Sequence, residues 1–347
     1  MTLSSPSTSL ESKASLANAL ADVHAGRIQT NSGFSQIPVS ILLDKIDFNQ
    51  PDVPPIGFYV FKDGTASLIR QPGEGFSRLA ISSYEHIWVR DVDFKFVRDY
   101  VDQLILNPKV NISLKPEERM DTLRRSAMIV VEDLFEHPSA ENINRSTKVV
   151  GSFVYVLMKD PKAYLMLSKL STHDPYTLQH SVGTSVNSII LARKVGVTDE
   201  KELLEAGLAG LLHDVGKVQV KKEIINKPGP LDPLEWEEMK THSHAGFEIV
   251  KNNPQLSERT KRAILEHHEE KNGTGYPGGL REDGISLFSK IVCISDIFNA
   301  LTTTRSYSQA RSPFDAFQLM REKLMHKVDE KLFKQLVLIY GGKVDPS

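Results

Sequence analysis

The spacing of apolar residues changes along the chain and predicts two kinds of structure. Between residues 36 and 95, clusters of Pro, Gly, Asp and Asn separate short apolar runs, which lie at 37–43, 56–63 and 87–94. Short apolar runs separated by turn-forming residues are typical of a small β-sheet. After about residue 96 the apolar runs lengthen and take helical spacing, for example at Val97, Val101 and Leu104.

From about residue 171 the pattern is helical almost throughout. Apolar residues recur every three or four positions after His180 and before His213, which predicts that both histidines lie at helix ends. His267 and His268 follow Ile264 by three and four residues, so this pair is expected on or beside a buried helix face. The pattern predicts a serine-rich leader, an α+β N-terminal domain and an all-α helical bundle, with bounds 1–35, 36–145 and 146–347.

The composition of the 347-residue chain excludes several classes of protein. Charged residues make up 25% and hydrophobic residues 40%, as in ordinary globular proteins, and the net charge of -2 argues against binding to nucleic-acid polymers or anionic membranes. A single cysteine, Cys293, excludes an internal disulfide. The most apolar stretch, 149–158, is much shorter than a membrane span, and the first 30 residues lack the apolar run of a secretory signal. We expect a cytoplasmic protein.

Histidines are concentrated in one part of the sequence. Seven of the eleven fall within 173–268, at positions 173, 180, 213, 242, 244, 267 and 268. A single histidine is most often structural, but a cluster of imidazoles with aspartates suits iron, manganese, nickel or zinc, and carboxylates can bridge two such ions. The sharpest motif is HDVGK at 213–217, which by itself is also explained as a capped helix end with polar residues.

The motifs around HDVGK occur in the order of a known family. They are YTLQHS at 176–181, INKPGPL at 225–231, THSH at 241–244, HHE at 267–269, GTGYPGGL at 273–280 and SDIFNALTTTRSY at 295–307. With HDVGK, they make residues 172–345 resemble an HD-GYP domain, the subgroup of the HD phosphohydrolase superfamily that is associated with cyclic di-GMP. The resemblance covers about half of the chain and does not extend to residues 1–145.

The resemblance implies a binuclear metal centre. Its two divalent transition-metal ions are expected to be iron, with manganese, nickel and zinc as alternatives. Asp214 would bridge the ions; His180, His213 and Asp296 would complete one coordination sphere, and His242, His267 and His268 the other. We expect these ligands to come from at least four helices, with loops 219–233 and 271–285 at the mouth of the site.

The resemblance also implies residues that act on the substrate. Lys217 would touch a phosphate or protonate the leaving ribose oxygen, although a lysine after a helix is also favoured by the helix dipole. Gly275, Tyr276 and Pro277 would form a wall of the active site, or else only a tight turn. Arg305 is a candidate phosphate ligand, with a surface ion pair as the alternative.

Three departures from the family pattern qualify this reading. Tyr176 replaces the glutamate that some members use to bind a third metal, so two ions are expected. Asn299 stands where many relatives have an aspartate, and Ser308 replaces a phosphate-binding lysine, so the grip on substrate would be weakened or altered. His173 and His244 match no ligand position and are interpreted as supporting or surface residues.

The leading hypothesis is a phosphodiesterase of bacterial second-messenger signalling. It would open cyclic di-GMP to linear pGpG, with GMP as a further product, and weak turnover is expected. The alternative is a degenerate HD-GYP module that acts as a nucleotide sensor or as an adaptor for protein signalling partners, which Ser308 and Asn299 favour. A general HD nucleotide phosphohydrolase is disfavoured because that chemistry does not require the GYP and KPG motifs. For residues 1–145, architecture alone suggests a regulatory role.

Overall fold

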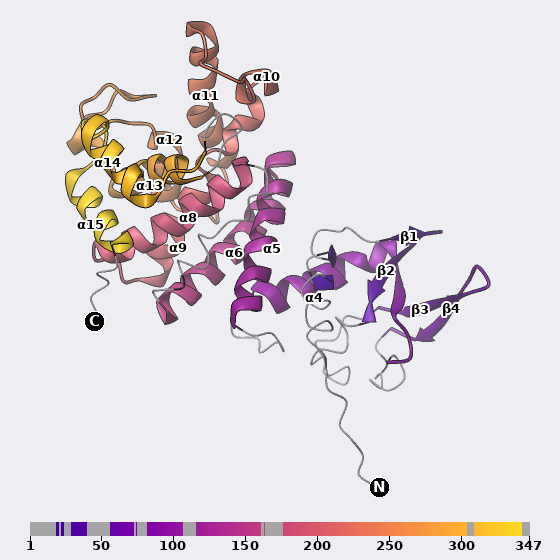
Figure 1. The fold of residues 1–347 in the computed structure, drawn as a ribbon. Helices are drawn as coiled ribbons and strands as arrows, with labels where there is room; N and C mark the ends of the chain where they lie inside the picture. Colours follow the sequence, from indigo (N-terminus) through magenta and orange to yellow (C-terminus); the bar gives the residue numbers. More distant parts are fainter. Residues whose placement is uncertain are drawn as a thin grey trace. The chain divides into compact units, whose positions relative to one another are not determined.

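The computed structural model describes most of the chain as two compact units, 1–129 and 130–347 (Figure 1). The described residues are 19–20, 22–23, 29–39, 56–72, 74, 82–106, 116–160, 163, 176–303 and 309–341. The division at 129/130 lies upstream of the boundary at 145/146 that the sequence pattern predicts. The predicted order, a sheet-containing N-terminal part followed by a helical C-terminal part, is confirmed.

The first unit contains a five-stranded antiparallel sheet in the order β1-β2-β5-β3-β4. Its strands are β1 (Thr30–Asn31), β2 (Phe34–Pro38), β3 (Phe58–Lys62), β4 (Thr65–Arg70) and β5 (His86–Arg90), and they are followed by α4 (Phe94–Leu106). Ile37 and Ile87 are paired across β2 and β5 and are both fully buried, so alternate residues of these strands form a core face. Asp63 and Gly64 both have positive φ and turn β3 back into β4.

The second unit is a helical bundle. Helix α5 (Pro116–Glu136) runs across the division between the units, and after it come α6 (Ala140–Lys159), α8 (Tyr176–Lys194), α9 (Glu200–Leu212), η3 (Val215–Gln219), α10 (Lys222–Ile225), α11 (Pro233–Val250), α12 (Glu258–Glu266), η4 (Glu282–Gly284), α13 (Leu287–Thr302), α14 (Pro313–Lys323) and α15 (Glu330–Tyr340). Within the described part of this unit, the only β-pairing is an isolated bridge between Asn272 and Arg281. The predicted all-α bundle is therefore confirmed.

Side-chain caps define where the site-bearing helices begin. Asp199 caps α9, Ser257 caps α12 and Ser286 caps α13, each by accepting a hydrogen bond from a main-chain amide three residues later. Asp232 and Glu235 form a capping box at the start of α11. Because a cap fixes the first turn, it also fixes which side chains of the helix face the core.

Helices α8 and α9 form the closest pair in the bundle, and both also contact α13. The hydroxyl of Ser185 on α8 donates to the carbonyl of Gly207 on α9 at 2.8 Å, which fixes their relative position. Val182 and Val186 of α8 and Leu208 and Leu211 of α9 are buried, as their spacing predicts. None of the helices in the described ranges is long and apolar enough to cross a membrane.

Candidate metal centre

The seven predicted metal ligands converge in the second unit. Their nitrogen and oxygen atoms form two groups, each with all of its atoms within 4.8 Å of one another: His180, His213 and Asp296, and Asp214, His242, His267 and His268. The residues come from α8, the end of α9, α11, the end of α12 and α13. The candidate ligand side chains therefore come from at least four helices, as expected from the sequence.

Adjacent ligands are possible because two helices end at the centre. His213 is the C-cap residue of α9, and the chain then turns at Asp214 into η3. His267 is likewise the C-cap of α12 and is followed by His268. Within one helix, consecutive side chains diverge by about 100°, so they rarely reach the same point. A helix end removes that restriction.

The glycine of HDVGK lets η3 approach α11. A Cβ atom at Gly216 would lie 2.0 Å from the carbonyl oxygen of His242 and 2.3 Å from the amide nitrogen of Gly246. These are main-chain atoms, which cannot move aside as a flexible side chain can. Only glycine therefore allows the contact that brings Asp214 close to His242.

Asp214 lies between the two groups. Its Oδ1 is 3.4 Å from Nε2 of His242, whereas its Oδ2 is 3.4 Å from Nε2 of His213 and 4.0 Å from Nε2 of His180. Asp214 is 1% exposed, so its carboxylate is directed into the protein rather than into solvent. The two oxygens of one carboxylate thus face opposite halves of the centre, which is the arrangement of a bridging ligand.

Main-chain carbonyls orient three of the imidazole rings. Nδ1 of His213 lies 2.8 Å from the carbonyl oxygen of Gly210, and Nδ1 of His242 and of His267 lie 2.7 Å from carbonyls of Met239 and Ile264. A carbonyl only accepts hydrogen bonds, so in each ring Nδ1 carries the proton and Nε2 holds a lone pair in the neutral form. These lone pairs point toward the centre.

The distances among the inward-facing atoms fit metal ions. Nε2 of His242 is 3.2 Å from Nε2 of both His267 and His268. Two lone pairs at this distance repel each other unless they share a cation, and two ligands at right angles with bonds of about 2.1 Å lie about 3 Å apart. Nε2 of His213 is buried and has no hydrogen-bond partner among the described residues. The donor set therefore fits two cations.

The electrostatic environment keeps His267, His268 and Asp214 in metal-binding form. For His213, burial alone would lower the pKa, but the charges of Asp214 and Asp296 raise it. Burial and the charge of neighbouring His242 lower the pKa of His268 to about 3, and burial together with His268 holds the pKa of His267 well below its usual value. Burial alone would raise the pKa of Asp214, but His213 and Lys217 more than offset it and hold that pKa well below its ordinary range. Carboxylate and neutral imidazole are the forms that bind metals.

The predicted substrate residues are brought to the centre only in part. Nζ of Lys217 is 2.5 Å from Oδ2 of Asp214, and the lysine side chain is 23% exposed. The ring of Tyr276 lies 4.7 Å from that of His268, centroid to centroid, and contacts Trp236 edge-on at 6.2 Å. Arg305, Ser308 and His173 lie outside the described residues, as do the side-chain surroundings of Tyr176.

Two buried side chains contribute in ways that the sequence did not reveal. Glu269, the last residue of HHE, is 2% exposed and accepts hydrogen bonds from the main-chain amides of Gly278 at 2.6 Å and Leu280 at 2.7 Å. It thereby anchors the segment that carries Tyr276. Asn299 is 6% exposed, and its Oδ1 atom lies 2.9 Å from Nδ1 of His180.

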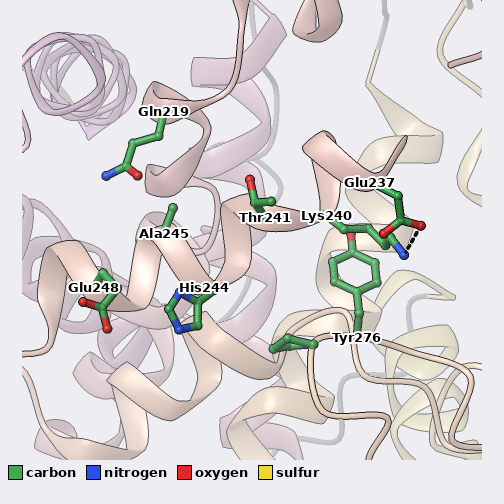
Figure 2. A pocket seen from close by; sticks show the side chains of 9 residues that line it. Gln219, Glu237, Lys240, Thr241, His244, Ala245, Glu248 and Tyr276 are labelled. Carbon is green, nitrogen blue, oxygen red and sulfur yellow. Dashed lines mark ion pairs between the residues drawn. The ribbon is translucent and has the colours of Figure 1, made fainter. Parts of the chain in front are cut away.

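A groove of about 500 Å³ runs along α11 beside the centre (Figure 2). Gln219 from one predicted loop and Tyr276 with Pro277 from the other both line it, so both loops border the same recess. His244 also lines this groove and belongs to neither ligand group.

Comparison with known proteins identifies the helical unit. Residues 168–332 match the family model of the HD domain. The chain is 37% identical over 185 residues to a cyclic di-GMP phosphodiesterase of Pseudomonas aeruginosa, covering 53% of this chain and 44% of that protein. It is 36% identical over 162 residues to 3'3'-cGAMP-specific phosphodiesterase 3 of Vibrio cholerae, covering 47% of this chain and 35% of that protein. The chain thus spans less than half the length of these relatives.

A solved structure has the same fold. Bd1817, an HDG"Y"P protein from Bdellovibrio bacteriovorus, superposes with a TM-score of 0.62 at 22% sequence identity. The match covers 89% of this chain and 100% of that one, so it extends beyond the helical unit. The family resemblance drawn from the sequence motifs is confirmed at the level of the HD domain.

Proposed function

We propose that this protein, whose residues 168–332 form an HD domain, is a metal-dependent phosphodiesterase that hydrolyses cyclic dinucleotides. Cyclic di-GMP is our first choice of substrate, and linear pGpG is the expected product, which a second hydrolysis would convert to GMP. The observation that carries the proposal is the position of Asp214, with one carboxylate oxygen toward each of two groups of metal-binding side chains.

The residues of the centre suit phosphodiester hydrolysis. Two divalent cations, when bound, supply charge that neutralises the phosphoryl oxygens and a nucleophile derived from water at neutral pH. In the overall reaction a water oxygen bonds to phosphorus, the bond between phosphorus and the ribose 3' oxygen breaks, and that oxygen takes up a proton. Lys217, beside Asp214 and in part exposed, is the side chain that we assign to deliver this proton.

The substrate class is proposed from the relatives and from the wall of the site. The named relatives act on cyclic di-GMP or on 3'3'-cGAMP, both of which carry two phosphates and at least one guanine. We assign Tyr276 to contact a base, because its ring lies next to His268 at the edge of the centre and an aromatic face stacks on any base. Gly275 and Pro277 shape this segment, and Arg305 remains our candidate phosphate ligand.

The adaptor hypothesis loses part of its support. Asn299 and Ser308 favour it, but Asn299 is buried and hydrogen-bonded to His180 instead of being exposed to contact a substrate. Seven convergent ligand side chains are also more than a protein-binding adaptor needs. The remaining argument for weak activity is Ser308.

One experiment tests the proposal directly. Full-length protein is purified without oxygen, its metals are quantified, and turnover of cyclic di-GMP and 3'3'-cGAMP is measured on the same sample. We expect about two transition-metal ions per chain and formation of a linear dinucleotide, which His213→Ala abolishes and His137→Ala, at an exposed position outside the ligand groups and the groove, retains. Metal-loaded protein that binds cyclic dinucleotides without hydrolysing them would support the sensor hypothesis. Protein that retains no transition metal would overturn the proposal.

A further inference from the structure

His180 differs from the other oriented ligands in what holds its ring. Nδ1 of His180 is 2.9 Å from Oδ1 of Asn299, across a separation of 119 residues between α8 and α13. For His213, His242 and His267, the corresponding partner is a main-chain carbonyl three residues earlier. His180 is therefore the ligand whose orientation depends on a side chain that can be substituted.

The amide of Asn299 is held in one orientation. The hydroxyl of Thr303 donates to the same Oδ1 atom at 3.2 Å. On the other side, a Cβ atom at Gly183 would lie 2.0 Å from Nδ2 of Asn299, so glycine is required for the amide to fit. Asn299 is 6% exposed. These contacts leave little room for the amide to rotate.

The orientation of Asn299 determines which nitrogen of His180 can bind a cation. Because Oδ1 only accepts hydrogen bonds, Nδ1 of His180 carries the proton and the lone pair of the neutral ring is on Nε2. That Nε2 atom lies 2.9 Å from Oδ1 of Asp296, a separation that suits two ligands of one ion. Asn299 thus directs the lone pair of His180 toward the half of the centre that contains Asp296 and His213.

We propose that Asn299 is a positioning residue that fixes the tautomer of His180 and, as a neutral acceptor, limits how strongly His180 donates to the ion it shares with His213 and Asp296. A carboxylate in the same place would pull on the Nδ1 proton and make Nε2 a stronger donor. The amide oxygen preserves the geometry without that added charge. The inference rests on the metal centre of the proposed function but not on the identity of the substrate.

The test is a titration of the metal-free full-length protein with Co²⁺, followed by calorimetry and by visible absorption of the bound ion. Asn299→Leu removes the acceptor and keeps the size of the side chain, and Asn299→Asp keeps the acceptor and adds charge. Asn187→Leu is the matched control. Asn187, on α8, has a buried side-chain amide like that of Asn299, and its Oδ1 accepts a hydrogen bond from the hydroxyl of Tyr340 at 2.6 Å.

We expect Asn299→Leu to weaken one of two Co²⁺ binding events roughly 10- to 100-fold and to leave the other nearly unchanged. Asn299→Asp should strengthen the same event by up to about tenfold and shift its absorption bands. Asn187→Leu should change neither affinity. If Asn299→Leu does not fold, Asn299→Asp still decides the matter. Two Co²⁺ ions bound with unaltered affinities and spectra in both Asn299 variants would overturn this inference alone, whereas a wild type that binds no Co²⁺ would overturn the metal centre as well.

Discussion

The ammonium of Lys217 lies 2.5 Å from Oδ2 of Asp214, one turn away along the chain. The two residues have different roles in the proposed reaction, because Asp214 faces both metal groups, whereas Lys217 is not a metal ligand and its side chain is 23% exposed. Substitution should therefore separate metal binding from proton transfer.

Lys217→Met should keep both metal ions and lose most activity. Loss of a general acid costs roughly 10²- to 10⁴-fold in rate, and the expected fall is in kcat rather than in metal content. Asp214→Ala should instead lose both ions, because it removes the ligand that the two groups share. Metal analysis and turnover of each variant check the prediction. A Lys217→Met protein without metal would assign the lysine to assembly of the centre instead.

Glu269→Gln should loosen the segment that carries Tyr276. The carboxylate of Glu269 accepts charge-assisted hydrogen bonds from the amides of Gly278 and Leu280, each worth about 1.5–3 kcal/mol. A neutral glutamine amide can accept only weaker hydrogen bonds there. Trypsin should then cleave faster at Lys271 or Arg281, which flank the segment, and KM should rise more than kcat falls. Glu322→Gln, a change of the same kind at an exposed site away from both cleavage points, serves as the control. Equal cleavage rates in the wild type and Glu269→Gln would refute the anchoring role.

The residues of the candidate metal centre can be picked out from the sequence because the relevant signals are local. Two pairs of adjacent residues follow apolar helical patterns, which indicates that each pair lies at a helix end. These pairs are His213 with Asp214 and His267 with His268. The helical fold of this half follows from the same periodicity. For these residues, local sequence and tertiary structure agree.

The rest depended on contacts between distant parts of the chain. In the sequence, Asn299 is recognisable only as a departure from the family pattern. Its hydrogen-bond partner His180 lies 119 residues away, so only the structure shows the contact. The same limit applies to the N-terminal sheet, whose short strands were predicted but whose order was not. Pairing of Ile37 with Ile87 places β5 between β2 and β3, and no local pattern specifies that choice.

Gly216→Ala should damage the centre without altering any ligand. The added Cβ would meet main-chain atoms of His242 and Gly246 at 2.0 and 2.3 Å, so η3 and α11 must separate. We expect destabilisation of at least about 2 kcal/mol and reduced metal content. Gly284→Ala is the control, because its nearest contact would be an ordinary 3.8 Å. Urea unfolding and metal analysis provide the measurement, and equal stability of the two variants would contradict the close approach.

The metal-free protein should lose stability as the pH falls below about 6.5. The folded-state pKa of His268 is lowered to about 3 and that of His267 lies well below normal, so the unfolded chain takes up protons there that the folded chain does not. Each such histidine contributes about 1.4 kcal/mol per pH unit between its unfolded and folded pKa values. The raised pKa of His213 acts only above about pH 6.5, in the opposite direction.

Urea unfolding of chelator-treated protein at pH 6.5 and pH 5.5 checks this expectation. His268→Gln removes one titrating group, so it should make the pH dependence shallower than in the wild type. A midpoint that does not move between these two pH values would mean that the histidines are protonated in the folded protein, and their role as neutral ligands would have to be abandoned.

Ser308→Lys should increase the affinity of the protein for a cyclic dinucleotide. The sequence ALTTTRSY resembles the family segment that supplies a phosphate-binding lysine, but Ser308 occupies that position and carries no charge. A restored charged contact to phosphate is worth about 1.5–3 kcal/mol, or roughly ten- to a hundredfold in affinity. Calorimetry of the metal-loaded protein with cyclic di-GMP measures the change. Gln309→Lys adds the same net charge one residue away, so a gain specific to position 308 distinguishes a phosphate contact from general attraction. If the two variants bind equally tightly, the assignment of position 308 to the phosphate site is wrong.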